Sequence, residues 1–141
     1  MSETTLRDRV LNIVREVDTV SFGELSNRFP EFRDGCAAYC LRGNVVLWSG
    51  MTDEAIDALD ALVANALIVA IPSSAKLYLY DGKRVNLPVA LPGKKYKKVH
   101  WLPVVWRPFE RCSPEIQKLV AQAADDAFDP AWWITDRNKN D

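Results

Sequence analysis

The sequence contains little of what catalytic sites are built from. Its 141 residues include one histidine, His100, and none of the GxSxG, HExxH, GxGxxG or GxxxxGK patterns that mark common nucleophilic, metal or phosphate sites. The acidic residues fall mostly on the surfaces of expected helices, where spacing alone brings no two carboxylates across a cleft. These absences predict a protein that is not an enzyme and that needs no cofactor.

Long apolar runs are also missing. The most apolar stretch, residues 61–72, is too short to span a bilayer and is interrupted by Asn65. The first ten residues, MSETTLRDRV, have neither the basic nor the apolar region of a secretory signal. We therefore expect a cytoplasmic protein with no membrane partner, whose three cysteines are reduced thiols.

Two of the cysteines are four residues apart, in the segment GCAAYC. One interpretation is a zinc site in which Cys36, Cys40, Cys112 and His100 supply four ligands. The other is core packing, because cysteine behaves as a small buried hydrophobe and this spacing suits one face of a helix. The CxxxC spacing differs from the tight CxxC of structural zinc sites, so we expect packing and no metal.

Apolar spacing and capping residues predict helices and strands in alternation, which is an α+β fold. Thr5 and Ser21 each precede an acidic residue by three positions, as is typical of helix N-termini. Before residue 51 we expect a helix over 6–17, a short strand at 19–20, a second helix ending near Phe29, a third helical piece within 33–41 and a strand over 44–50.

Thr52 begins the clearest helix of the chain. Its apolar stripe should be buried: Ile56, Leu59, Leu62 and Val63. Its carboxylates should be exposed: Asp53, Asp57 and Asp60. The residues that follow predict a hairpin, with one strand ending at Ile71, a Pro-Ser-Ser turn and a second strand ending at Tyr80.

This order of elements over residues 6–80 resembles the winged-helix superfamily: helix, short strand, helix, helix and a two-stranded wing. The resemblance implies that the last helix, residues 52–66, enters the major groove of DNA and that the wing turn, residues 72–76, touches the DNA backbone. It divides the chain into a winged-helix-like part, residues 1–85, and an extension, residues 86–141. The extension should consist of short strands, a basic loop and a C-terminal helix that begins at Ser113, packed on the first part as one unit.

Positive charge is concentrated in one stretch of the chain. Residues 86–111 contain six Lys or Arg and one acid, whereas residues 51–70 contain four acids and no base. A helix with four carboxylates is repelled by phosphates, so the helix after Thr52 is a poor groove reader. The expected nucleic-acid contacts are therefore Lys94, Lys95, Tyr96, Lys97, Lys98 and His100, with support from Lys76 and Arg42.

The aromatic residues among these lysines have two interpretations. Tyr96, His100 and Trp101 either stack on bases or anchor the segment in the core. The first interpretation fits a small DNA-associated regulatory protein, which is the function that the sequence favours.

The alternative is a winged-helix scaffold that binds another protein as an adaptor or inhibitor. Its contacts would lie on the acidic helix or at the aromatic end of the chain: Asp53, Asp57, Asp60, Trp132 and Trp133. The segment YKKVHWLPVV is similar in style to small uncharacterised proteins of temperate bacteriophages, where such regulators would fit. The sequence leaves the oligomeric state open, with a homodimer as one alternative.

Overall fold

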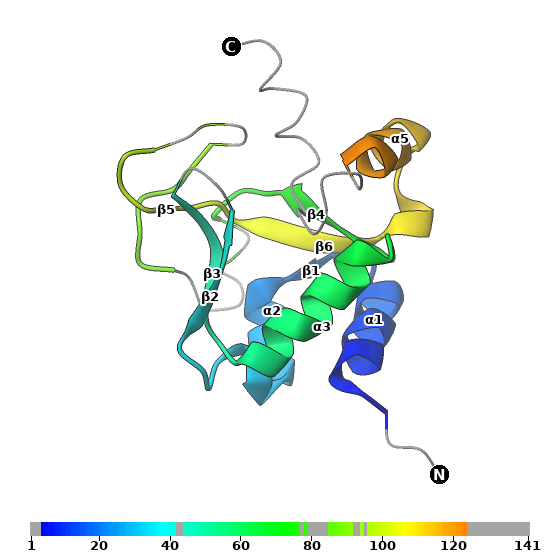
Figure 1. The fold of residues 1–141 in the computed structure, drawn as a ribbon, viewed down its shortest axis with the longest axis horizontal. Helices are drawn as coiled ribbons and strands as arrows, with labels where there is room; N and C mark the ends of the chain where they lie inside the picture. Colours follow the sequence, from blue (N-terminus) through cyan, green and yellow to red (C-terminus); the bar gives the residue numbers. More distant parts are fainter. Residues whose placement is uncertain are drawn as a thin grey trace.

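The fold is α+β, as the sequence predicts. The computed structural model describes residues 4–41, 44–76, 78, 85–91, 94 and 96–123. Its helices are α1 (Leu6–Val17), α2 (Phe22–Arg28), α3 (Asp53–Ala64) and α5 (Pro114–Ala123), with short 3₁₀ turns η1 (Pro30–Phe32) and η2 (Phe109–Arg111). The strands form two small sheets, and Figure 1 shows α1, α2 and α3 together on one side of the first sheet.

The first sheet, sheet A, joins the two halves of the chain. Its order is β1 (Val20–Ser21), β6 (Val104–Pro108) and β4 (Ile68–Pro72), with both neighbouring pairs antiparallel. The central strand β6 comes from the second half, whereas both edge strands come from the first. The sheet of the first half is therefore complete only when residues from the extension pack into it.

The second sheet, sheet B, has the order β2 (Ala37–Leu41), β3 (Val45–Met51) and β5 (His100–Trp101). β2 and β3 form an antiparallel hairpin, and β5 joins β3 in parallel through the pairs Val45–His100 and Val46–Trp101. In Figure 1 this sheet lies beside the end of sheet A where β6 begins. It places the residues before β5, which include the basic segment, at an edge of the molecule.

The helix starts follow the capping residues read from the sequence. The Thr5, Ser21 and Thr52 hydroxyls each accept a hydrogen bond from the backbone N–H three residues later, at 3.0–3.2 Å. Each such bond satisfies one of the donors that a helix leaves free at its first turn. The bounds of α1 match the predicted range of 6–17, and α3 begins directly after Thr52.

Residues 33–41 contain a strand, so the predicted third helical piece is wrong. From residue 38 to residue 41, exposed and buried positions alternate, which is the period of a strand with one solvent face. Gly35 permits this path, because a Cβ there would lie 2.1 Å from the Met51 carbonyl oxygen. Close approach to the end of β3 thus favours the hairpin over a helix.

The predicted hairpin after α3 is also corrected. Its first strand is present as β4, but β4 pairs with β6, about 35 residues further on, along its whole length. Ala75 and Lys76 form a turn, and the N–H of Tyr78 donates to the Ala75 carbonyl. The rest of the expected second strand lies outside the described residues.

Six large aromatic residues form the centre of the core: four come from the two sheets, Phe22 comes from α2, and Tyr78 lies outside the strands. The Phe22 ring lies parallel to the Trp48 ring, at 5.7 Å and 5°, and meets Trp106 edge-on at the same distance. Trp48 also packs on Tyr78, which in turn meets Trp101 edge-on at 5.0 Å. All of these residues and Tyr39 are at most 5% exposed. The cluster joins sheet A, sheet B and α2 into one core.

Tyr78 adds directed bonds to this cluster. Its hydroxyl accepts from the Phe22 backbone N–H at 3.0 Å and donates to the Val104 carbonyl at 2.6 Å. The first partner is a helix-start donor of α2 and the second lies in β6. A single buried hydroxyl therefore satisfies groups from the two halves of the chain.

We predict that Tyr78→Phe lowers the free energy of unfolding by about 1–3 kcal/mol, because the buried Phe22 N–H loses its acceptor. Urea denaturation measures the change. Tyr96→Phe is the matched control: its hydroxyl accepts from the Leu91 N–H near the surface, where water can replace it. Equal losses in the two variants would contradict the buried role of the Tyr78 hydroxyl.

Candidate functional site

The basic segment expected to bind nucleic acid precedes β5. We call residues 94–98 the lysine strip. Lys94, Lys97 and Lys98 are exposed, and Lys95 lies outside the described residues. No ion pair joins the three described lysines to any carboxylate in the part of the chain that the structure describes. Within those residues, their charges therefore have no fixed counter-charge.

The backbone of the strip is held by one side chain from the β2–β3 turn. The Asn44 side-chain amide donates to the Tyr96 carbonyl at 2.8 Å and to the Lys97 carbonyl at 3.3 Å. The Asn44 carbonyl accepts from the His100 N–H at 2.9 Å. Asn44 has a positive φ of 60°, a conformation that asparagine tolerates better than most residues. The lysine backbone is thus fixed to the folded core.

Tyr96 serves as an anchor of the strip. It is half-buried against the core, and its ring stacks on His100 with 3.8 Å between centroids and 16° between planes. Its hydroxyl accepts from the Leu91 N–H at 2.8 Å. One ring face is therefore already occupied, which leaves less of Tyr96 for contact with a base.

Trp101 and His100, like Tyr96, pack against the protein. Trp101 is fully buried, and its indole N–H donates to the Leu47 carbonyl at 3.2 Å. The stacking interpretation is wrong for Trp101, because the core covers it on all sides. His100 is half-buried, with Nδ1 2.9 Å from the Lys98 carbonyl oxygen. The site consists of cations on an anchored loop, and its described aromatic residues form no open stacking platform.

Exposed apolar residues precede and follow the lysine strip in the sequence. Val89, Leu91 and Val99 are 45%, 55% and 42% exposed. Leu91 is tied to the strip, because its N–H donates to Tyr96 and its carbonyl accepts from the Lys94 N–H. Basic and apolar groups therefore occur together at this edge of the molecule.

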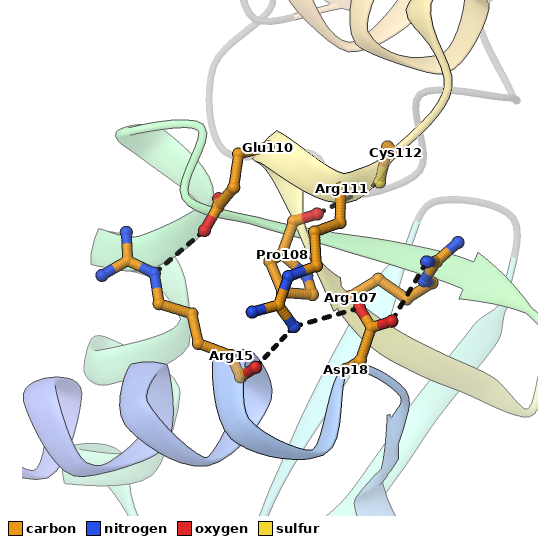
Figure 2. A network of polar contacts seen from close by, with 7 residues as sticks. All are labelled: Arg15, Asp18, Arg107, Pro108, Glu110, Arg111 and Cys112. Carbon is orange, nitrogen blue, oxygen red and sulfur yellow. Dashed lines mark hydrogen bonds and ion pairs between the residues drawn. The ribbon is translucent and has the colours of Figure 1, made fainter.

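The arginines of the same basic stretch have a different role. Asp18, at the end of α1, lies 3.5 Å from the guanidinium groups of both Arg107 and Arg111. Arg15 pairs with Glu110 at 3.1 Å, and Arg111 donates to the Arg15 carbonyl. Figure 2 shows these groups joining α1 to β6 and η2. These ion pairs connect the two halves, and among the described residues of the stretch 86–111 they leave the lysines as the cations without an ion pair.

Of the other residues predicted to contact DNA or a protein partner, some lie outside the described part of the chain. Lys76 lies in an exposed turn after β4, where its N–H donates to the Ser74 hydroxyl at 3.1 Å. The backbone N–H of Ser73 donates to the Pro103 carbonyl, so this turn begins beside the segment that leads from β5 to β6. Arg42 lies outside the described residues, as do Trp132 and Trp133.

The predicted acidic face of α3 is exposed at Asp53, Glu54 and Asp57, but not at Asp60. Asp53, Glu54 and Asp57 are exposed, and no ion pair with a described residue neutralises them. Asp60 was expected to be exposed but is half-buried, because the Tyr39 hydroxyl of β2 reaches it at 3.1 Å. Burial raises the pKa of Asp60, the Tyr39 hydrogen bond lowers it, and the charge of Asp57 raises it.

The apolar stripe of α3 is confirmed at its centre. Leu59 and Leu62 are fully buried, whereas Ile56 and Val63 are half-buried and pack against the core. The last two were expected to be buried. They lie at the margins of the stripe, where the helix faces solvent.

The cysteines overturn the core-packing interpretation for one pair. Cys36 and Cys40 are exposed, and only Cys112 is buried, with its thiol 3.4 Å from the Pro108 carbonyl oxygen. The reason is the strand conformation of residues 37–41, which directs Ala38 and Cys40 outward and Tyr39 inward. Burial raises the pKa of the Cys40 and Cys112 thiols.

The described residues contain neither a metal-binding cluster nor a membrane-spanning helix. No group of three or more His, Cys, Asp or Glu is arranged to hold a metal ion among them. No helix within the same residues has the length and apolar character needed to cross a membrane.

We predict that Asp60→Asn stabilises the protein at neutral pH by less than about 1 kcal/mol, since the group is only partly buried. A raised pKa means that the folded state favours the protonated acid. The wild type therefore loses stability as pH rises from below the ordinary value of 3.8 through the raised value. Urea denaturation from acid to neutral pH should show the two proteins converging at acid pH.

Asp53→Asn is the control for this measurement. Its carboxylate stands in the first turn of α3, where a negative charge favours the helix, so its removal should lower stability at neutral pH. A stabilising effect of the same size in both variants would indicate general charge repulsion and contradict the burial argument for Asp60.

Comparison with protein-family models, with curated proteins and with solved structures finds no match for this chain.

Proposed function

We propose that this chain is a non-catalytic, DNA-associated regulatory protein that contacts nucleic-acid phosphates through the lysine strip. The observation that carries the proposal is the combination of unpaired charge and a fixed backbone. Lys94, Lys97 and Lys98 are exposed and form no ion pair with any described carboxylate, and Asn44 holds the backbone at Tyr96 and Lys97. A pre-positioned loop loses less conformational entropy on binding than a free one.

The expected mode of binding is independent of base sequence. Lysine ammonium groups attract phosphates and release counterions, which supplies affinity without reading bases. The acidic face of α3 makes this helix unsuitable for the major groove, since Asp53, Glu54 and Asp57 would face phosphates on both sides. The apolar side chains of Val89, Leu91 and Val99 would contact sugars or the faces of unpaired bases.

The winged-helix resemblance supports this proposal in a modified form. The elements α1, β1, α2 and α3 occur in this order, with η1 and the β2–β3 hairpin between α2 and α3. After α3 comes β4, which forms an antiparallel pair with β6. In this interpretation β4 and β6 are the two wing strands, and residues 73–103 are an insertion between them. The lysine strip then belongs to an enlarged wing, which in winged-helix proteins touches the DNA backbone.

The second candidate is a scaffold that binds a basic protein partner through α3. It is favoured by one observation: the three exposed carboxylates of α3 form no ion pair with a described residue, whereas Asp18, Glu24, Glu31 and Glu110 each do. Charges of one sign on one helix face suit a partner of the opposite sign. In this case the lysine strip would serve solubility.

We predict that changing Lys94, Lys97 and Lys98 together to Ala weakens binding to all DNA sequences alike. The slope of log affinity against log salt should fall by about 3 for duplex and about 2 for single-stranded DNA, because each phosphate contact contributes about 0.9 or 0.7. Fluorescence anisotropy with random-sequence DNA over a range of salt concentrations measures this slope. Stability should change little, since the side chains are exposed.

The control variant changes Arg7, Arg28 and Lys118 to Ala, which removes the same total charge from exposed sites on α1, α2 and α5. It should bind nearly as wild type. The proposal fails if the wild type shows no salt-sensitive binding to duplex or single-stranded nucleic acid at low salt. It also fails if the strip variant and the control variant lose equal affinity, because the charge would then act without regard to position.

A further inference from the structure

β2 is an edge strand of sheet B and has an uncharged sequence. The sheet order is β2-β3-β5, so β3 covers one side of β2, and within the described residues no named strand covers the other. The strand reads AAYCL, with neither a charged residue nor a proline. Natural edge strands usually carry such residues to prevent pairing with another chain. The edge of β2 that no described strand covers lacks this protection.

The geometry of β2 is also suited to pairing. The hairpin with β3 has two irregularities, but both place the extra residue on β3: Leu47 and Gly50 have no partner on β2. Gly50 adopts a φ of 79°, which glycine reaches without strain. The bulges therefore lie on the inner strand, and β2 itself runs without an inserted residue.

The exposed side chains along β2 are arranged symmetrically. Ala38 and Cys40 are exposed and lie on the solvent face of β2, and the exposed Cys36, which directly precedes the strand, continues the same spacing of two residues. Ala38 lies midway between the cysteines. If two copies of β2 pair antiparallel about Ala38, Cys36 of each copy lies opposite Cys40 of the other.

We propose that β2 pairs antiparallel with β2 of a second copy of this chain, in a two-fold symmetric dimer centred on Ala38. A two-fold interface requires a surface that is complementary to itself, and this strand meets that condition with small uncharged residues at the centre. The cysteine spacing is reciprocal about the same centre. An unrelated peptide would need neither feature, which is why the second copy is the occupant.

The dimer leaves the core and the lysine strip as they are. Tyr39 and Leu41 remain buried within their own copy, since pairing at the edge does not turn the strand over. The joined sheet would have the order β5-β3-β2-β2-β3-β5, and the strip precedes β5 at each outer edge. The dimer is therefore independent of nucleic-acid binding, and each proposal can fail without the other.

Sedimentation velocity over a wide range of concentrations tests the dimer. The wild type should show a concentration-dependent dimer, and Ala38→Lys should abolish it, because two like charges would face each other on the two-fold axis. Ser49→Lys is the matched control: Ser49 is exposed, pairs with Ala38 and belongs to β3, one strand further in. It should dimerise as wild type. A monomer at every concentration, or equal loss of dimer in both variants, would overturn the proposal.

The native cysteines test the register. Under oxidised glutathione, the thiolate of one cysteine displaces glutathione and forms a mixed disulfide, which the opposite cysteine attacks. Two thiols thus form one disulfide, and one oxidised glutathione is reduced to two glutathione molecules. Cys36 and Cys40 of one copy are four strand residues apart, roughly 13 Å, which is too far for a disulfide within the strand. Peptide mass spectrometry after acid quenching should therefore find Cys36 joined to Cys40 between copies.

Variants that keep only one of the two exposed cysteines distinguish disulfides formed in this register from disulfides formed by random collision of two molecules. In the proposed dimer, Cys36→Ser and Cys40→Ser should each lose rapid covalent dimerisation, because each remaining thiol then faces serine. Cys112 serves as the internal control, since it is buried and should stay unmodified under the same conditions. Rapid formation of Cys36–Cys36 or Cys40–Cys40 disulfides in these variants would refute pairing about Ala38.

Discussion

The stacking of Phe22 on Trp48 and its edge contact with Trp106 hold the molecule together. Phe22 begins α2, Trp48 belongs to sheet B and Trp106 is in the central strand of sheet A. Aromatic residues of this size each remove a large apolar area from water, and their edge and face contacts fix relative orientation. The position of sheet B depends on these contacts, and with it the position of the loop that carries the lysines.

Local features of this fold could be predicted from the sequence, because they depend on neighbouring residues. Thr5, Ser21 and Thr52 cap helices as expected, since a hydroxyl and an N–H three residues on meet in any helix start. The partner of β4 could not be predicted in this way. β4 has a β-prone sequence followed by a turn, which suits a hairpin equally well, and only the packing of distant residues selects β6.

The same distinction explains the errors at the candidate site. The segment GCAAYC has residues compatible with a helix or a strand, and the close contact of Gly35 with Met51 decides for a strand. That choice turns two cysteines from core residues into surface residues. Asp60 was predicted to be exposed from its place on the helix, yet Tyr39 approaches it from a different element. Helical periodicity describes one element, whereas burial depends on what packs against it.

The net charge of a stretch of sequence differs from the charge that the folded protein presents to a partner, because some charged groups form internal ion pairs. The stretch 86–111 has a large positive excess, but Arg107 and Arg111 share Asp18, and Glu110 pairs with Arg15. These pairs connect α1 to β6 and η2 and so belong to the packing of the two halves. The lysines lie on a loop that packs through Tyr96 and Asn44, which leaves their ammonium groups in solvent. The fold thus divides one basic stretch into arginines that stabilise it and lysines that remain available for a negatively charged ligand.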